Sequence, residues 1–504
     1  MKEDIMHFFV VSTVLVFLAY LLQSSIIMSP DVSYLIHAAW VLFQGGHYVS
    51  QIFETNPPMI LYLYLPIHLL VKIVTGDIVF ALRLYILTLS LISFGTCFYL
   101  LQKVIPRNRF YRYSLSLTLL WVLFLLPLFA FGQREHLWII LTLPYLFTMA
   151  LFFENQSISR KMRFVIGLFG GLGFALKPFF IIPFIFLELY AIFIKRSIFA
   201  VFRIESLTIV GVILSYLISI YIWQPEYIDI ILPYVFKYYF PFFIESISVL
   251  LLRPEVLFCF GVMIGYLVFY SSDRYKAFGA TLWLTSVGMT LAYLIPRQTW
   301  YYHFYPAMCL AYLLSMHCLT QLCSGKNIKS NIFYLCLLSA LFYSVPLYNY
   351  YALLTAVSAF KKTYPILPIE KYINTQKGER SIYCFSLFTS DCFPLVYSAK
   401  MRYAERFSSF WWYKGISAME KINHPSKASD VLQDKKFLID SVSEDLNQLK
   451  ARWVIVNEGN FHVLEYPAFD LIDYFSQNDK FREAWKNYHY LQKMNGYRIY
   501  EREN

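Results

Sequence analysis

The sequence predicts a polytopic α-helical membrane protein with about eleven transmembrane helices and a small C-terminal α/β domain outside the membrane. Of its 504 residues, 58% are hydrophobic and only 15% are charged. A soluble chain would have roughly 25% charged residues. Apolar runs of about 18 residues or more, long enough to cross a bilayer, recur up to residue 351. The composition then becomes more polar, which marks the separate C-terminal domain.

The apolar runs give the predicted transmembrane segments. They lie near residues 5–27, 78–102, 113–131, 137–154, 164–178, 179–194, 204–224, 254–271, 277–295, 305–323 and 331–351. The first run follows Lys2 and contains no small-residue cleavage site. We therefore expect a retained membrane span there, not a cleaved signal peptide.

Basic residues between the apolar runs orient the chain, because cytoplasmic loops are enriched in Lys and Arg. With the N-terminus inside, every predicted internal loop is basic. The loop residues are Lys103, Arg107, Arg109, Arg112, Arg160, Lys161, Arg163, Lys195, Arg196, Arg203, Arg274, Lys276, Lys326 and Lys329. The formal charge of +11 is thus distributed over short loops instead of forming one basic stripe, which argues against nucleic-acid binding. We expect a multi-pass membrane protein with a cytoplasmic N-terminus and an extracytoplasmic C-terminal domain.

Residues 28–77 form the first predicted outer segment. Its apolar stretches are short and are broken by "QGGHY" and "NPP". Helices lying in the membrane interface suit this pattern better than spans do. Pro57 and Pro58 are well placed to start one of these helices.

The predicted domain boundary separates a membrane domain, residues 1–360, from an extracytoplasmic α/β domain, residues 361–504. Residues 381–388 and 452–458 read as buried strands. A helix between them has Ser429 as its expected N-cap. Its apolar face would contain Leu438, Val442, Leu446 and Leu449.

Two of the eight cysteines, Cys384 and Cys392, fall in the polar tail. They would be able to form a disulfide if the tail lies outside the cytoplasm. The other cysteines lie in or beside apolar segments, where a small hydrophobic side chain is the ordinary role. The spacing shows neither a CxxC pair nor a zinc site.

Isolated charges of the membrane domain gather on its predicted outer side. They are Asp31, Glu54, Arg134, Glu135, Lys177 and Arg297. A charge at the centre of a membrane helix would cost roughly 2.5–3.5 kcal/mol. The sequence Gln133–His136 therefore indicates an outer helix end.

Structural roles are the alternatives for these residues. Asp31, beside Pro30, would cap a helix. Arg134 and Glu135 would form a local ion pair beside lipid headgroups. Lys177 would extend its side chain to the interface, and the tyrosines near residue 301 would belong to an aromatic belt.

The order of these residues resembles that of the GT-C superfamily of membrane glycosyltransferases. The resemblance begins with an acid after the first span, a stretch of the form A-x-x-L-x-x-G-x-x-Y and an acid before a double proline. It continues with an Arg at the start of the second span, an acid at the start of the fourth span, a turn that contains Lys, and a loop with two adjacent tyrosines. In this chain the residues are Asp31, Ala39, Leu42, Gly45, Tyr48, Glu54, Arg83, Glu135, Lys177, Tyr301 and Tyr302. Within this superfamily, the chain is similar to protein mannosyltransferases, aminoarabinose transferases and lipid-A galacturonosyltransferases. Val32 and Asn56 stand where aminoarabinose transferases have Glu and Lys.

This resemblance implies transfer of one sugar from a polyprenyl-phosphate donor to a lipid, glycan or protein acceptor of the cell envelope. Asp31 is the expected base, since an attacking hydroxyl must lose its proton. Glu135 is the second expected catalytic residue and would orient the acceptor or Arg134. Cations near the departing phosphate would stabilise the transition state. The expected phosphate-binding residues are Arg134, Lys177, Arg297 and His303, and the expected substrate-binding residues are His47, Glu54, Asn56, His136, Tyr301 and Tyr302.

Other functions remain open at this stage. A transporter or flippase for a lipid-linked sugar would need charges along an interior path, whereas Arg83 and Glu188 are expected near the outer ends of their spans. A non-catalytic envelope assembly protein is a further alternative. No cofactor is required, although a divalent cation held by Asp31, His47, Glu54 and His136 would be compatible with the sequence. A phosphate acceptor would need no base, and Asp31 would then only position groups.

Overall fold

The structure is a computed structural model that describes residues 2–106, 108–300, 302–323, 366–393, 395–421, 425–458 and 470–503. The chain divides into two compact units, each assembled from separate parts of the sequence. Unit 1 contains residues 1–27, 80–219 and 244–358. Unit 2 contains residues 28–79, 220–243 and 359–504. The predicted boundary near residue 360 lies outside the described residues.

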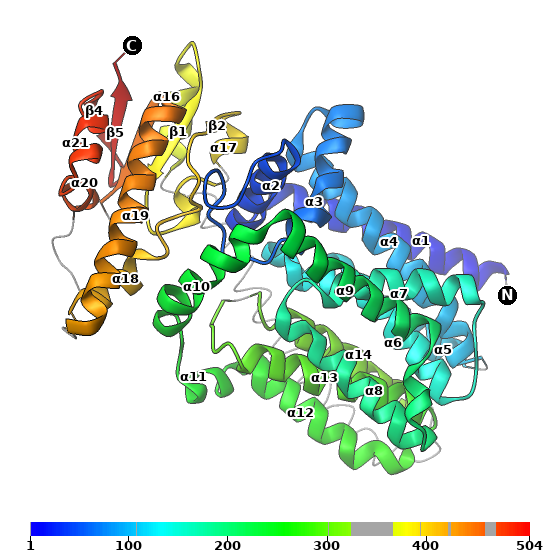
Figure 1. Cartoon of the computed structure of the whole chain (residues 1–504). Helices are drawn as coiled ribbons and strands as arrows, with labels where there is room; N and C mark the ends of the chain where they lie inside the picture. Colours follow the sequence, from blue (N-terminus) through cyan, green and yellow to red (C-terminus); the bar gives the residue numbers. More distant parts are fainter. Residues whose placement is uncertain are drawn as a thin grey trace. The chain divides into compact units, whose positions relative to one another are not determined.

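Unit 1 is a bundle of α-helices (Figure 1). Its helices are α1 (Lys2–Ser25), α4 (Ile78–Val104), α5 (Arg109–Leu120), α6 (Arg134–Phe153), α7 (Arg160–Phe174), α8 (Ile182–Lys195), α9 (Ile204–Trp223), α11 (Ile247–Leu251), α12 (Pro254–Phe269), α13 (Lys276–Leu294) and α14 (Tyr305–Cys323). The bundle also contains a short π-helix, η2 (Trp121–Leu125), and four short 3-10 helices: η3 (Leu128–Ala130), η4 (Pro178–Ile181), η5 (Ile198–Val201) and η9 (Tyr270–Ser272).

The apolar runs predicted before residue 324 coincide with helices of this bundle. Among the described residues, six helices are long and apolar enough to cross a membrane, or up to seven if Val10–Ser25 and Pro30–Phe43 together make one span. The run at 331–351 lies outside the described residues, so the total of about eleven spans stays a prediction.

Helix α6 forms the centre of unit 1. Every residue from Arg134 to Leu151 is buried, and the helix packs against α7, α13 and α14. Glycines allow α7 to approach closely: a Cβ at Gly173 would lie 2.7 Å from Thr142, and one at Gly167 would lie 2.7 Å from the carbonyl oxygen of Glu205. These glycines therefore let α7 pack closely on its neighbours, as small residues do in membrane helices.

Unit 2 combines the first predicted outer segment with residues 220–243 and the C-terminal tail. Helix α3 begins directly after Pro58, as the double proline predicts. Whether α2 and α3 lie along a membrane surface stays a prediction. The helices and turns are α2 (Pro30–Phe43), α3 (Met59–Leu70), η1 (Val71–Thr75), η6 (Tyr227–Ile231), α10 (Leu232–Tyr234), η7 (Val235–Tyr239), η8 (Phe240–Phe242), α16 (Leu367–Thr375), η10 (Thr389–Asp391), α17 (Leu395–Ser398), α18 (Tyr413–Lys421), α19 (Pro425–Leu449), α20 (Leu471–Phe475) and α21 (Asp479–Trp485).

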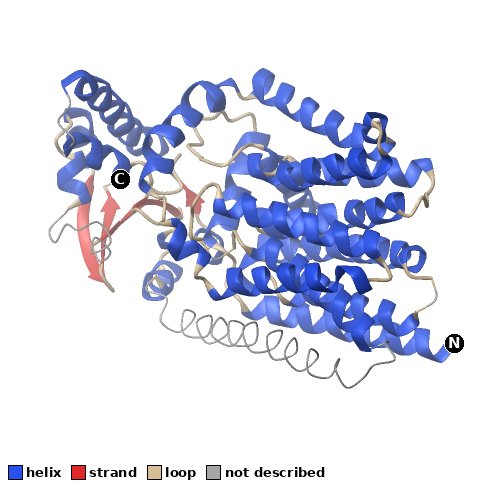
Figure 2. Ribbon diagram, turned by 90° about the horizontal axis from the view of Figure 1, so that it is seen from below, coloured by secondary structure: helices blue, strands red, loops and turns tan. Residues whose placement is uncertain are grey.

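The strands described in the tail form one five-stranded sheet in the order β2-β1-β3-β5-β4. Figure 2 draws these strands in red. Its strands are β1 (Ser381–Phe385), β2 (Arg402–Tyr403), β3 (Trp453–Asn457), β4 (Tyr488–Met494) and β5 (Tyr497–Arg502). Strand β1 is parallel to both neighbours, while β5 is antiparallel to β3 and β4. Every residue of β1 and β3 is buried, so the two predicted buried strands are confirmed. Asn495 and Gly496, with φ of 47° and 83°, close the β4–β5 hairpin in the left-handed conformations that a tight turn requires.

The long tail helix starts earlier than predicted. Helix α19 begins at Pro425, so the expectation that Ser429 caps it is wrong. Proline suits the first helical position because its missing N–H would have no partner in the helix. The expected apolar face is largely confirmed: Leu438, Val442 and Leu446 are buried, whereas Leu449 at the helix end is half-buried.

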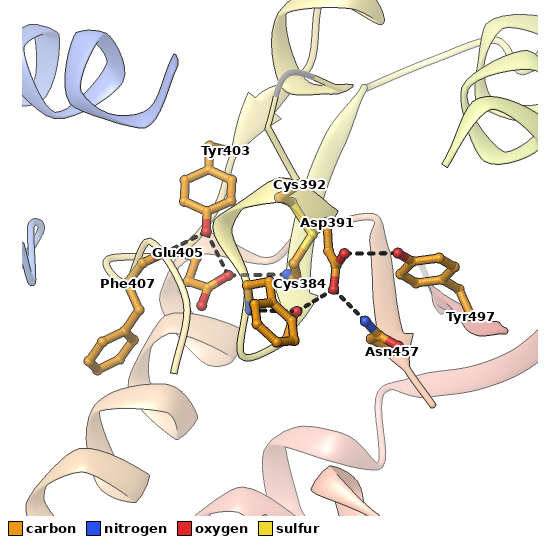
Figure 3. Close-up of a disulfide and its surroundings, with 10 residues drawn as sticks. Cys384, Asp391, Cys392, Tyr403, Glu405, Phe407, Asn457 and Tyr497 are labelled. Atoms are coloured by element: carbon orange, nitrogen blue, oxygen red, sulfur yellow. Dashed lines mark hydrogen bonds between the residues drawn. A yellow bond between two sulfur atoms is a disulfide. The ribbon is translucent and has the colours of Figure 1, made fainter. Parts of the chain in front are cut away.

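Cys384 and Cys392 form a disulfide with a Cα–Cα distance of 6.2 Å (Figure 3). Two buried carboxyl groups flank it. The Cys384 N–H donates to Glu405 at 3.1 Å, and the Tyr497 hydroxyl donates to Asp391 at 2.8 Å. Burial raises the pKa of both carboxyl groups. The disulfide thus closes a buried, hydrogen-bonded corner of the tail.

Candidate active site

Three segments of unit 1 bring charged and aromatic side chains together. Gln133 is the N-cap of α6, so Arg134 and Glu135 occupy the first turn of a deeply buried helix. Lys177 has an extended backbone and precedes Pro178 at the start of η4. The loop before α14 supplies Tyr302 and His303. We call Arg134, Glu135, Lys177, Tyr302 and His303 the Lys177 cluster.

An ion pair forms the centre of the Lys177 cluster. Lys177 Nζ donates to Glu135 Oε1 at 2.5 Å. The Glu135 side chain is only 1% exposed, whereas the Lys177 side chain keeps 17% of its surface exposed. Buried charges need partners, and a carboxylate at a helix N-terminus also gains from the helix dipole. Within the described part of the chain, the second oxygen of Glu135, Oε2, has no hydrogen-bond partner.

Tyr302 connects the two cations of the cluster. Arg134 Nη2 donates to the Tyr302 hydroxyl at 3.3 Å. The Arg134 guanidinium lies 5.7 Å and Lys177 Nζ lies 5.8 Å from the centre of the Tyr302 ring. Both cations are therefore within the range of cation–π attraction to a single ring.

His303 packs against the ion pair, with only 9% of its side chain exposed. Its Nε2 lies 3.8 Å from Glu135 Oε1, and its ring packs edge-on against Tyr302. Burial lowers the pKa of His303 well below its usual value, and the positive charges of Lys177 and Arg134 lower it further. The imidazole is therefore neutral at neutral pH.

Other expected site residues of unit 1 are placed elsewhere. His136 points into the bundle, where Nε2 donates to the Leu123 carbonyl at 2.9 Å and Nδ1 accepts from the Gly132 N–H at 3.1 Å. Arg297 Nε donates to the Glu245 carbonyl at 2.9 Å. Neither side chain joins the Lys177 cluster through these contacts. Tyr301 lies outside the described residues.

Asp31, in unit 2, occupies the first turn of α2. Ser29 takes the N-cap position and Pro30 begins the helix, so Asp31 is not the cap residue itself. Its side chain is half-buried. A carboxylate in the first turn is favoured by the helix dipole.

Glu54 closes the turn before the double proline in the same unit. It is 4% exposed, and its Oε1 accepts hydrogen bonds from the Asn56 backbone N–H at 2.8 Å, from the Asn56 amide and from the Thr55 hydroxyl at 3.1 Å. His47 is exposed and lies 3.9 Å from Glu226. The expected pair Glu54 and Asn56 is thus brought together, and these contacts shape the turn.

A second buried charge cluster in unit 1 shows an error of the sequence interpretation. Arg203 Nη2 donates to Glu188 Oε1 at 2.6 Å, which places Glu188 beside the loop expected to be cytoplasmic. The expectation that Glu188 lies towards an outer helix end is wrong, because Arg203 supplies its countercharge. Glu205 bonds Arg203 at 3.0 Å and Arg163 at 2.7 Å. We call Arg163, Glu188, Arg203 and Glu205 the Arg203 network.

Sequence reasoning also missed Tyr227 and Arg406 of unit 2. The Tyr227 hydroxyl donates to the Thr55 carbonyl at 3.2 Å, and Arg406 contacts the first outer segment at several points. A single Arg or Tyr carries no local signal of a partner that is hundreds of residues away. Among the described residues, no group of three or more His, Cys, Asp or Glu side chains is arranged to hold a metal ion.

The comparisons with known proteins identify solved structures with a similar fold. No protein-family model and no curated protein matches the chain. Two crystal structures of ArnT from Cupriavidus metallidurans, one bound to undecaprenyl phosphate and one in the apo state, match over 99% of this chain and 98% of theirs. The TM-score is 0.59 and the sequence identity 12% in each case. The chain therefore has a fold similar to that of ArnT, which agrees with the resemblance seen in the sequence.

Proposed function

We propose that the protein is a polyprenyl-phosphate-dependent glycosyltransferase of the GT-C type in a bacterial inner membrane. The observation that carries the proposal is the Lys177 cluster: Glu135, Lys177 and His303 meet in a partly exposed group at a helix start, within a fold similar to that of ArnT. One of the matched ArnT structures is bound to undecaprenyl phosphate, which supports a donor of this lipid class.

Lys177 and Arg134 have the chemistry needed at the leaving group. When the bond between the anomeric carbon and the phosphate oxygen breaks, negative charge increases on the polyprenyl phosphate. Fixed cations near that oxygen stabilise the transition state more than the ground state. Pairing with Glu135 and contact with the Tyr302 ring hold Lys177 in a defined position, and Arg297 is a further proposed phosphate ligand.

Asp31 is the proposed base. The acceptor hydroxyl attacks the anomeric carbon, its proton passes to the Asp31 carboxylate, and the polyprenyl phosphate leaves with the bonding electrons. A single displacement of this kind inverts the anomeric centre, by analogy with inverting glycosidases. Glu135 Oε2, buried and without a partner among the described residues, is available to accept a hydrogen bond from a substrate hydroxyl or amine. His47, Glu54 and Asn56 are proposed to contact the substrate.

The Cys384–Cys392 disulfide supports an extracytoplasmic location for the tail. Disulfides form and persist in oxidising compartments such as the periplasm. This location agrees with the orientation derived from the basic loops. The acceptor would then be an envelope lipid, glycan or protein.

The decisive experiment measures transfer by the purified full chain in lipid nanodiscs. Synthetic polyprenyl-phosphate sugars are supplied with envelope lipids, and mass spectrometry quantifies polyprenyl phosphate and glycosylated product. We expect Asp31→Asn to lower transfer by about 10²–10⁴-fold while donor binding and thermal stability are retained. Asp229→Asn, an exposed acid of the same unit, is the matched control and should behave like the wild type.

The outcomes separate the candidate functions. Transfer by the wild type excludes a purely non-catalytic assembly role. Donor movement across a vesicle membrane without any product would favour a flippase. Full activity of Asp31→Asn would remove the base assignment while leaving the transferase proposal intact.

A further inference from the structure

Arg406 of the tail contacts the first outer segment at three points. Its carbonyl oxygen accepts hydrogen bonds from the Tyr34 hydroxyl at 2.9 Å and from the Phe53 N–H at 2.8 Å. Its Nη1 donates to the Val49 carbonyl at 3.1 Å. All of these contacts lie inside unit 2 and join residues more than 350 positions apart. One residue of the tail therefore fixes the outer segment at its first helix and at its turn.

Arg406 is itself held firmly by α19. Its Nε donates to Asp445 Oδ1 at 2.8 Å and its backbone N–H donates to Asp445 Oδ2 at 3.0 Å. Its Nη2 reaches Glu444 at 3.3 Å. The side chains of Arg406 and Asp445 are only 6% and 3% exposed. A buried, charge-assisted pair with several hydrogen bonds has a well-defined geometry.

The points that Arg406 contacts lie next to proposed site residues. Tyr34 is one helical turn after Asp31 on α2, and Phe53 immediately precedes Glu54. Val49, which lies between Tyr34 and Phe53 in the sequence, has a φ of 71°, a conformation that β-branched residues rarely adopt. Such a conformation persists only where the surroundings determine it. The Arg406 guanidinium is one of the groups that do so.

Aromatic packing reinforces the same connection. The Tyr34 ring packs edge-on against Phe393 at 5.6 Å and against Tyr403 at 6.3 Å. Phe393 directly follows Cys392 of the disulfide. The face of α2 that carries Tyr34 is therefore in contact with the disulfide-closed corner of the tail.

We infer that Arg406 is a positioning residue for the transfer reaction: through Tyr34, Val49 and Phe53 it sets the location of α2 and of the turn at residues 47–56. The inference rests on the proposed function for its catalytic consequence, but its structural part stands on the contacts alone. The tail thus helps to set the geometry of the proposed site and does not act as an independent module. Displacement of a catalytic group by about 1 Å can cost 10²-fold in rate.

Two measurements on the full chain in nanodiscs test the inference. Hydrogen–deuterium exchange followed by mass spectrometry reports on peptides that cover residues 44–58, and the transfer assay reports the rate at saturating donor together with the donor KM. Arg406→Ala keeps the carbonyl that accepts from Tyr34 and Phe53 but removes the guanidinium that bonds Val49 and Asp445 and so holds this carbonyl in place. It should accelerate exchange in these peptides and lower the saturated rate by about 10-fold or more, with a smaller change in KM. Tyr34→Phe removes one hydroxyl without changing the packing and should lower the rate several-fold at an unchanged thermal midpoint.

Arg452→Ala is the matched control, because Arg452 forms an ion pair with Glu501 at 2.8 Å in the same tail. It should leave exchange at residues 44–58 and transfer unchanged. Unchanged exchange at residues 44–58 in Arg406→Ala would overturn the inference, as would an equal loss of activity in Arg452→Ala. If Arg406→Ala does not fold, Tyr34→Phe decides: wild-type activity and wild-type exchange would overturn the inference. A wild type without transferase activity would refute the proposed function, while the exchange result would still decide the positioning role.

Discussion

The two buried charge clusters of unit 1 differ in their balance of charge. The Arg203 network contains two guanidinium groups and two carboxylates, and the Arg203 side chain is only 5% exposed. Within unit 1, the Lys177 cluster contains two cations and one carboxylate, and Lys177 is 17% exposed. In a balanced buried cluster each charge already has its partner, and removing one partner is costly, whereas a partly exposed group with more cations than carboxylates suits an anionic ligand. The comparison teaches that burial of charge alone does not distinguish a structural cluster from a site.

Replacing Lys177 should give the largest effect. Lys177→Ala removes a cation proposed to lie at the departing phosphate, and loss of one such group typically costs about 10²–10³-fold in rate. We expect transfer to fall by this factor and donor affinity to weaken more than acceptor affinity. Nanodisc transfer assays and donor titrations measure both quantities.

Lys161→Ala, an exposed residue of α7, is the control for this variant. Equal weakening of donor and acceptor binding would argue against a phosphate contact. Because Lys177→Ala leaves Glu135 buried without its partner, the thermal midpoint of the variant is measured beside its transfer rate to separate lost catalysis from lost stability.

The opposite result is expected for the Arg203 network. Among the described residues, Arg203→Ala leaves the buried Glu188 without a countercharge and Glu205 with Arg163 as its only cation, and breaking a buried pair in this way costs roughly 3–5 kcal/mol. The thermal midpoint in detergent should fall strongly, while the activity per folded molecule stays near that of the wild type. Arg160→Ala, which alters an exposed arginine, should change stability by less than about 0.5 kcal/mol. A stable but inactive Arg203→Ala protein would contradict a purely structural role for the Arg203 network.

The smallest expected effect is the pH dependence of stability that His303 causes, which tests whether this residue of the Lys177 cluster is neutral. The pKa of His303 is lowered in the folded state, so below about pH 6.5 the unfolded chain binds more protons at this position. Stability should therefore fall as the pH decreases below that value, by at most about 1.4 kcal/mol per pH unit for one such group. His303→Gln should reduce the difference in thermal midpoint between pH 7.5 and pH 5.5. Identical pH dependence in both proteins would contradict a neutral, buried His303.

Local patterns predicted much of the fold. Long apolar runs located the helices before residue 324, and the isolated Lys177 marked a break between two of them, because hydropathy and proline act over short stretches. The buried strands of the tail were predicted for the same reason. The start of α19 differs from the prediction because Pro425, which suits a first helical position, begins the helix four residues before Ser429.

Pairings between distant residues were not predictable in the same way. Glu188 and Arg203 each look like an ordinary residue of a helix and a loop, and only packing brings them together. The assembly of residues 28–79, 220–243 and the tail into one unit likewise depends on contacts such as Arg406 with Tyr34. For the site, the sequence predicted the types of residue and their helix ends. The ion pair of Glu135 with Lys177 and the position of His136 inside the bundle required the structure.

The cross-link between Cys384 and Cys392 has a consequence for redox sensitivity. A thiol pair stays oxidised only in an oxidising compartment, so reduction would remove the covalent closure of the corner beside Phe393. Because the Tyr34 ring packs on Phe393, thiol reductants are expected to loosen this packing as well, which the thermal midpoint with and without reductant measures.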